Sequence, residues 1–193
     1  MRSHTVTTES TRKLVHLSAL LIPVLSELTS KPVVLIALSV ITISYLIEEV
    51  LRCKGQRVPL LTSFTLRLSR PEEEASFNIR PADLAIGIIL ALVLYPSTIA
   101  YAAIVVAAVG DSVAATVGRA VGRRHIIGRK TLEGFAAGFA ASSLAAFLLV
   151  PPVVALTGAA GGMFMELLDV PDDNLTMPIV AGAWMMIVTL VLR

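Results

Sequence analysis

A single carboxylate interrupts a long uncharged stretch in the middle of this 193-residue chain. Asp111 is the only charged residue between Leu84 and Gly118. A charge within an apolar segment is costly, so such a residue is a candidate for function, with pairing to a neighbouring helix as the alternative. Carboxylates bind hard cations such as Mg²⁺, and the adjacent Gly110 permits a ligand or metal to approach the backbone closely. We therefore predict Asp111 as a metal ligand.

A cluster of cations follows Asp111. Residues 119–130 contain five basic side chains interleaved with glycines. Arginine offers two parallel donors to phosphate, and glycine lets backbone amides approach phosphate oxygens. The alternative is a loop that anchors to anionic lipid head groups. With Asp111 near enough to hold a divalent ion, we predict a polyphosphate site made of Gly110, Ser112, Arg119, Arg123, Arg129, Lys130 and Thr131.

Acidic residues gather near the carboxyl end of the chain. They are Glu166, Asp169, Asp172 and Asp173, followed by Asn174. Acidic residues contribute little to the orientation of a membrane protein, so metal binding or acid–base chemistry explains them better.

Polar residues with helical spacing lie at the amino end. They are Glu9, Arg12, Lys13 and His16. A period of 3.6 residues places Glu9, Lys13 and His16 on one side of a helix. The alternative is that Arg12 and Lys13 are membrane anchors and that His16 is an ordinary helix residue. The histidines and Cys53 do not have the spacing of zinc ligands.

The composition of the chain is that of an integral membrane protein. Hydrophobic residues make up 55% of it and charged residues 16%, and the mean hydropathy is +0.81. A soluble domain of this size would lack the polar surface it needs. The lone Cys53 excludes a disulfide scaffold. A formal net charge of +2 gives no reason to expect a nucleic-acid partner.

Uncharged stretches divided by proline predict an all-α, polytopic helical bundle with about seven transmembrane segments. Pro96 and the pair Pro151-Pro152 separate neighbouring segments, because proline lacks a backbone donor and disfavours helix just before it. Several segments are short for a full crossing, which suggests tilted or re-entrant pieces. The predicted segments are residues 14–28, 32–51, 82–95, 97–118, 132–150, 152–168 and 175–192.

Basic residues predict the orientation, because Lys and Arg accumulate in cytoplasmic segments. With a cytoplasmic amino terminus, 14 of the 16 basic residues lie inside, and only Lys31 and Arg193 lie outside. The three clusters that follow the amino end are then each expected at a helix end facing the cytoplasm. We treat residues 1–193 as one membrane domain, with an interfacial amphipathic segment or a plain connector at about 52–80. The sequence does not decide whether the protein forms a homo-oligomer.

Three groups of motifs, in order along most of the chain, resemble those of the polyprenol kinases. They are Glu9-x-x-Arg12-Lys13-x-x-His16; Gly110-Asp111-Ser112 with Gly118-Arg119 and Gly128-Arg129-Lys130-Thr131-Leu132-Glu133-Gly134; and Glu166 with Asp173-Asn174-Leu175-Thr176-Met177-Pro178. That family includes dolichol kinase, phytol kinase and the CTP-dependent diacylglycerol kinase, and it is distantly similar to the phosphatidate cytidylyltransferases. The first and last motifs favour the kinases.

The resemblance implies transfer of the terminal phosphoryl group of CTP to the hydroxyl of a membrane isoprenoid alcohol, dolichol or another polyprenol. The products would be the lipid monophosphate and CDP. Asp111 and, as a second metal ligand, Asp173 would hold Mg²⁺ against the β- and γ-phosphates, and Asn174 would contact the nucleotide beside them. Glu133 or Glu166 would accept the proton of the alcohol. Arg12, Lys13 and His16 would complete the phosphate site at the cytoplasmic face.

Two other functions fit parts of the sequence. A cytidylyltransferase would attack the α-phosphate of CTP from a lipid phosphate and release pyrophosphate. A small membrane transporter would also place charges within a helical bundle. A transporter would not need its charges confined to the cytoplasmic edge.

Overall fold

The computed structural model describes residues 15–56, 77–168 and 173–192. Parts of three predictions lie outside these ranges. They are the motif residues Glu9, Arg12 and Lys13, the acids Asp169 and Asp172, and most of the segment at 52–80.

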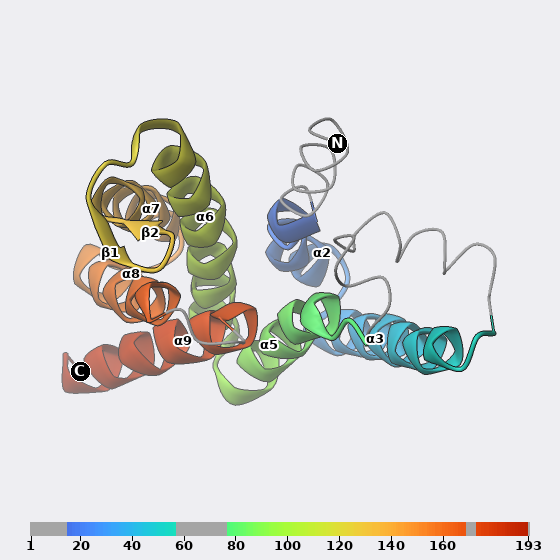
Figure 1. Ribbon diagram of the computed structural model, residues 1–193. Helices are drawn as coiled ribbons and strands as arrows, with labels where there is room; N and C mark the ends of the chain where they lie inside the picture. The colour runs from blue at the N-terminus through green and yellow to red at the C-terminus, as the bar shows by residue number, and fades with distance from the viewer. Residues whose placement is uncertain (1–14, 57–76, 169–172, 193) are drawn as a thin grey trace.

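Helices make up most of the described chain, which confirms the predicted all-α class. Seven helices occur in the described residues, and they overlap the seven predicted segments (Figure 1). They are α2 (Leu21–Leu28), α3 (Lys31–Cys53), α5 (Arg80–Leu94), α6 (Ser97–Val121), α7 (Leu132–Ala146), α8 (Pro152–Leu167) and α9 (Asp173–Val191). A helical turn at residues 15–18 precedes α2.

Of the described helices, α3, α6 and α9 are long and apolar enough to cross a membrane. The helical stretch Val15–Leu28 and helices α7 and α8 are apolar but shorter. The outer face of α3 exposes Ile36, Val40, Ile43 and Ile47, and such side chains suit contact with lipid. The protein is therefore compatible with a membrane, while seven full crossings stay a prediction.

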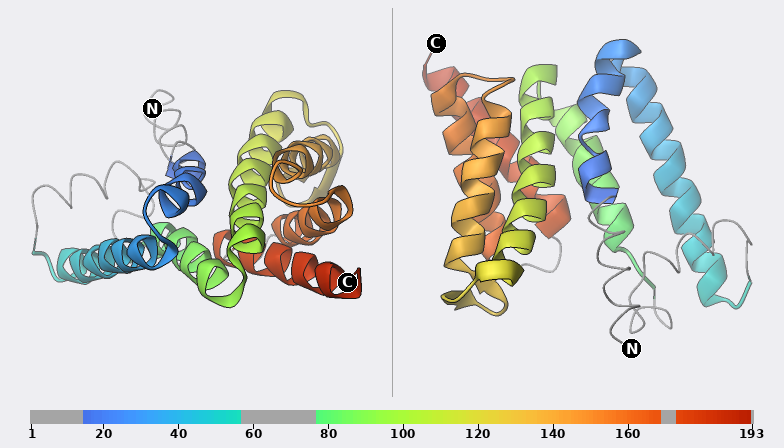
Figure 2. Two further views of the ribbon diagram at one scale, coloured as in Figure 1. Left: turned by 180° about the vertical axis from the view of Figure 1, so that it is seen from behind. Right: turned by 90° about the horizontal axis from the view of Figure 1, so that it is seen from above.

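Helix α6 lies between two groups of helices (Figures 1 and 2). On one side it packs with α5 and with residues of α2 around an apolar core, and α5 also contacts α3. On the other side it packs with α7, α8 and α9. Helix α5 also contacts α9, so the two groups meet beside α6. One helix therefore presents different faces to both groups.

Helix directions alternate through the bundle. In the right panel of Figure 2, the carboxyl ends of α3, α6 and α8 lie at the same end of the bundle as the amino ends of α5, α7 and α9. At the opposite end, Lys31 Nζ donates a 2.9 Å hydrogen bond to the carbonyl oxygen of Tyr95, between α5 and α6. This alternation agrees with the division of the chain by its basic residues. The side of the membrane that each end faces stays a prediction.

Small residues bring α6 and α7 close together. A Cβ atom at Gly138 of α7 would lie only 2.8 Å from the carbonyl oxygen of Gly110 and 2.7 Å from Met163 Cε. A Cβ atom at Gly110 would lie 2.7 Å from Met163 Sδ. The open approach to the backbone that we predicted at Gly110 is therefore filled by Met163 of α8, because the glycine serves helix packing.

A short hairpin, which the sequence did not lead us to predict, follows α6. Strand β1 (His125–Ile127) pairs antiparallel with β2 (Lys130–Thr131). Gly128 lies between the strands with φ at 55°, a left-handed conformation that favours glycine. The hairpin turns the chain from α6 into α7.

Two glycines of the predicted phosphate loop hold the hairpin against α6. Cβ atoms at Gly118 and Gly122 would lie 2.9 and 2.6 Å from Thr131 Oγ1. These glycines therefore leave space for the Thr131 side chain. Their close approach to protein replaces the approach to phosphate that we predicted for the glycines of this loop.

We expect Gly138→Ala to lower the free energy of unfolding by about 1–3 kcal/mol, because the added methyl group overpacks the contact with the Gly110 backbone. Thermal unfolding in detergent would show this as a lower Tm. Ala140→Leu, which enlarges a side chain on the exposed side of α7, is the control and should leave Tm nearly unchanged. A Gly138→Ala variant as stable as the wild type would contradict the importance of this close contact.

Candidate active site

Asp111 lies well inside α6, contrary to the prediction that its cluster marks a helix end. Residues 112–121 continue the helix beyond it, by about 15 Å along the axis. Gly118 lies inside the helix, where it closely approaches Thr131, and it does not end the helix. The Asp111 side chain is nevertheless 22% exposed, so a ligand can reach it.

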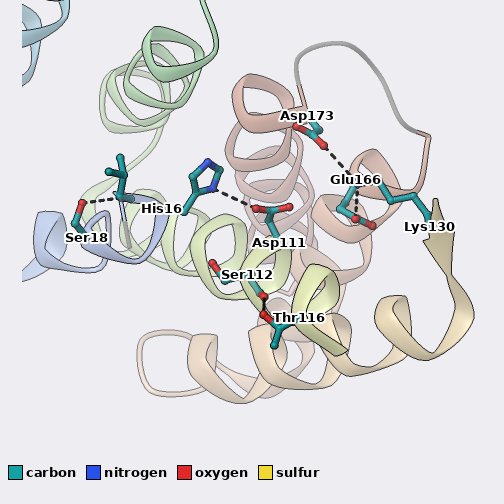
Figure 3. Close-up of polar contacts among 9 residues, drawn as sticks. His16, Ser18, Asp111, Ser112, Thr116, Lys130, Glu166 and Asp173 are labelled. Carbon is teal, nitrogen blue, oxygen red and sulfur yellow. Dashed lines mark hydrogen bonds and ion pairs between the residues drawn. The ribbon is translucent and has the colours of Figure 1, made fainter. Parts of the chain in front are cut away.

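His16 contacts Asp111 (Figure 3). The His16 Nδ1 atom lies 3.2 Å from Asp111 Oδ2, and the His16 side chain is 13% exposed. This contact joins the amino-terminal motif to the Gly-Asp-Ser motif, as the predicted site requires. The contact also agrees with the alternative interpretation of Asp111, in which its carboxylate pairs with a neighbouring helical segment.

Lys130 of the hairpin connects to two helices of the other group. Its Nζ atom lies 2.5 Å from Glu166 Oε1 at the end of α8 and 3.5 Å from Asp173 Oδ2 at the start of α9. The Glu166 side chain is only 4% exposed, and Lys130 is 20% exposed. Three of the predicted site residues, from three separate elements, therefore meet at one ammonium group.

The surroundings of Lys130 keep it charged. Burial alone would lower its pKa, but the hydrogen bond and charge of Glu166, with the charges of Asp173 and Asp111, outweigh burial and raise the pKa above its ordinary value. The stability that this pairing contributes is therefore fully present at neutral pH, and it is lost only when the pH rises through the raised pKa. At working pH Lys130 is a fixed cation.

Asp111 and the Lys130 contacts share one region. The charge of Asp111 acts on Lys130, Glu166 and Asp173. Figure 3 places His16 on one side of Asp111 and the other three residues on the other side. We call Asp111, Lys130, Glu166 and Asp173 the charged cluster.

Two predicted site residues have structural partners outside the charged cluster. Glu133 Oε2 accepts hydrogen bonds from the backbone N–H groups of Arg123 (3.1 Å) and Arg124 (3.2 Å). Thr131 Oγ1 accepts a 3.2 Å hydrogen bond from the Gly134 N–H and caps the start of α7. Both residues therefore shape the connection between α6 and α7.

The remaining predicted phosphate contacts are spread around the charged cluster. Arg119, Arg123 and Arg129 are exposed, on the last turn of α6 and around the hairpin. Asn174 is half-buried at the start of α9, and its carbonyl oxygen would lie 2.8 Å from a Cβ atom at Gly87 of α5. The arginines are therefore placed to meet a ligand from water, while Asn174 packs on α5 through its backbone.

The carboxylates of the charged cluster are of a type that can bind Mg²⁺, which prefers carboxylate oxygens, phosphate oxygens and water. The Lys130 ammonium group occupies the space between Glu166 and Asp173. Among the described residues, no group of three or more His, Cys, Asp or Glu side chains is arranged to hold a metal ion. A metal ion bound here would therefore need phosphate or water ligands as well.

A second polar cluster, at the end of α3, was missed in the sequence. Buried Glu49 accepts hydrogen bonds from Arg52 Nε (2.9 Å) and from the backbone N–H of Asn78 (2.5 Å). Tyr45 donates a 2.6 Å hydrogen bond to the Asn78 carbonyl oxygen. These contacts tie the end of α3 to the residues before α5. The sequence did contain a signal, because Glu49 is followed three residues later by Arg52. We had counted Arg52 only among the basic residues that predict the orientation in the membrane.

Comparisons of the chain with protein-family models, with curated proteins and with solved structures found no match. A proposal for function therefore depends on the motifs and on the geometry of the charged cluster.

We expect Lys130→Met to lower the free energy of unfolding by about 2–4 kcal/mol, because it leaves the buried Glu166 carboxylate without its cation. Adding Glu166→Gln should recover part of the loss, since it removes the unpaired charge. Thermal unfolding in detergent would measure both changes. Arg129→Met, which removes a neighbouring exposed cation, is the control. Equal losses of stability for Lys130→Met and Arg129→Met would argue against a specific role for the Lys130 pairing.

Proposed function

We propose that this chain is a CTP-dependent lipid kinase that transfers the γ-phosphoryl group to the hydroxyl of a membrane isoprenoid alcohol, dolichol or another polyprenol. The observation that carries the proposal is the charged cluster, in which a half-buried lysine meets carboxylates beside a surface that bears arginines. Phosphoryl transfer asks the protein chiefly for positioning and for neutralisation of charge. The choice of CTP and of the alcohol rests on the resemblance of the motifs.

Lys130 and the exposed arginines would bind the triphosphate. Lys130 supplies a compact charge within the charged cluster, whereas Arg119, Arg123 and Arg129 supply planar donors at the aqueous side. A triphosphate that enters along the hairpin would meet the arginines first and Lys130 last. This order suits a nucleotide whose terminal phosphate must arrive beside the lipid.

Asp111 and Asp173, together with phosphate oxygens, would hold Mg²⁺, which neutralises charge on the β- and γ-phosphates when it is bound. The contact between His16 Nδ1 and Asp111 would hold the Asp111 carboxylate in place. Lys130 would exchange a carboxylate contact for a phosphate oxygen, because its ammonium group has three donors.

The transfer itself needs one proton acceptor. The alcohol oxygen forms a bond to the γ-phosphorus, the bond between that phosphorus and the bridging oxygen of CDP breaks, and the hydroxyl proton passes to a carboxylate. Of the two predicted acceptors, Glu133 binds backbone amides of the hairpin connection, whereas Glu166 lies in the charged cluster. Of these two residues, Glu166 is therefore the better candidate for the proton acceptor.

Transfer of label from CTP tests the proposal directly. With CTP labelled at the γ-phosphate, purified protein and dolichol or a shorter polyprenol, we expect labelled lipid monophosphate and unlabelled CDP. Asp111→Asn should lower the rate by at least ~100-fold, because it removes the charge but keeps the volume of the side chain. Glu27→Gln, an exposed acid of α2, is the control and should keep full activity. Removal of Mg²⁺ with a chelator should stop the transfer, and added Mg²⁺ should restore it.

Other products would identify other functions. Pyrophosphate and a CDP-lipid, formed from CTP and a lipid phosphate, would identify a cytidylyltransferase. If the protein transferred no phosphoryl group from CTP or ATP to dolichol or to a shorter polyprenol, the kinase proposal would be overturned.

We propose that the charged cluster faces the cytoplasm, because the basic residues are concentrated at the end of the bundle that carries it. Cys53 is exposed at the end of α3, at that same end of the bundle. Thr98 is exposed in the first turn of α6, at the opposite end. These two positions therefore report on the two sides of the membrane.

We expect Cys53 to react with an impermeant thiol reagent only from the cytoplasmic side of sealed vesicles. In a Cys53→Ser background, Thr98→Cys should react only from the other side. Labelling of both positions in permeabilised vesicles is the control for reactivity. Reaction of Cys53 from outside intact cells would contradict the proposed orientation.

A further inference from the structure

The hydroxyl of Ser112 is buried without a hydrogen-bond partner among the described residues. Ser112 is 6% exposed, and its Oγ atom has no donor or acceptor within reach in the described part of the chain. An unsatisfied buried hydroxyl costs about 1–3 kcal/mol. Buried polar groups of this kind are few in folded proteins, and each one calls for an explanation. A ligand that binds to the hydroxyl is one such explanation.

The position of Ser112 in the sequence of α6 shows on which face of the helix it lies. Ile104 and Ala108 of α6 pack in one apolar core with Ala19 and with Leu84 of α5. Ser112 follows these residues at a spacing of four, so it continues the same face of the helix. Figure 3 shows Ser112 on the His16 side of Asp111, away from Lys130. The Ser112 hydroxyl therefore lies on the side of α6 that packs with α2 and α5.

This side of α6 is chemically different from the side of Lys130. The exposed arginines and Lys130 lie at the end of α6 and at the hairpin, whereas the described residues that precede Ser112 on its face of α6 pack in an apolar core. A neutral hydroxyl on an apolar chain suits these surroundings, because it needs one hydrogen bond and otherwise apolar contacts.

We propose that Ser112 binds the hydroxyl of the acceptor alcohol, with His16 beside it and Asp111 between this subsite and Lys130. The inference rests on the proposed kinase function, and it moves Ser112 from the predicted nucleotide site to the lipid site. The apolar chain of the alcohol leaves past Leu17 and Leu21, which follow His16 and are 39% and 57% exposed. The two substrates then approach Asp111 from opposite sides.

Binding of the alcohol without nucleotide tests the subsite independently of catalysis. The probe is a farnesol analogue with a photoreactive diazirine, added to the protein in nanodiscs, and its cross-linking is competed with farnesol or with the corresponding hydrocarbon that lacks oxygen. We expect farnesol to compete more strongly than the hydrocarbon in the wild type. Ser112→Ala should weaken competition by farnesol about tenfold and leave competition by the hydrocarbon unchanged.

A matched control separates a ligand contact from a general effect of buried serines. Ser143 of α7 is 3% exposed and also has an Oγ atom without a partner in the described residues. In the Ser143→Ala variant, farnesol should compete with the photoreactive probe as strongly as it does in the wild type. Equal affinity for farnesol in Ser112→Ala and the wild type, or equal weakening in both serine variants, would overturn the inference. So would a wild type that binds farnesol no better than the hydrocarbon.

Steady-state kinetics distinguish this inference from the kinase proposal. In Ser112→Ala we expect the KM for the alcohol to rise about tenfold, with the KM for CTP unchanged. A rise in the KM for CTP instead would return Ser112 to the nucleotide site and overturn the inference. A wild type that binds farnesol through Ser112 but transfers no phosphoryl group from CTP would overturn the kinase and leave the alcohol subsite standing.

Discussion

The ion pairs of Lys130 decide how the second half of the molecule is assembled around α6. A buried carboxylate such as Glu166 is stable as an anion only with a cation beside it. The cation comes from the hairpin, so the hairpin must lie against the end of α8 and the start of α9. The same ammonium group fixes the distance between those two helix ends. Removing this interaction would leave carboxylates from two helices facing each other without a counterion.

Close packing of small residues makes that placement possible. The hairpin reaches its position because Gly118 and Gly122 leave space for Thr131, and α7 reaches α6 because Gly138 lies against the Gly110 backbone. Met163 fills the remaining space between α6, α7 and α8, and its flexible side chain adapts to the contact. Backbone packing therefore positions the residues that form the ion pairs, and Gly110, Gly118 and Thr131 of this packing also belong to the motifs of the sequence.

The sequence predicted the helices well and the local roles within the motifs poorly. Pro96 and Pro151 divide apolar stretches by steric rules that need no knowledge of the tertiary structure, and the helices begin where those rules place them. The roles of Glu133 and Thr131 depend on which backbone N–H groups lie within reach, and spacing alone does not reveal this. Pairing of Asp111 with a neighbouring helix was the alternative to metal binding, because an isolated carboxylate in an apolar helix needs a partner, but the sequence did not identify His16 as that partner.

The length of α6 relates the depth of Asp111 to the proposed reaction. Asp111 lies about 21 Å along the axis from Ser97, and the hydrocarbon core of a bilayer is about 30 Å thick. If Ser97 marks one edge of the core, Asp111 lies about 9 Å below the other edge, and Arg119 lies about 3 Å beyond that edge. The arginines that we propose as phosphate contacts are then in water, while the carboxylate is at the level of lipid chains. A reaction between a nucleotide and a lipid hydroxyl needs groups at both levels. Lys130 links the two levels, because it lies on the hairpin after α6 and belongs to the charged cluster with Asp111.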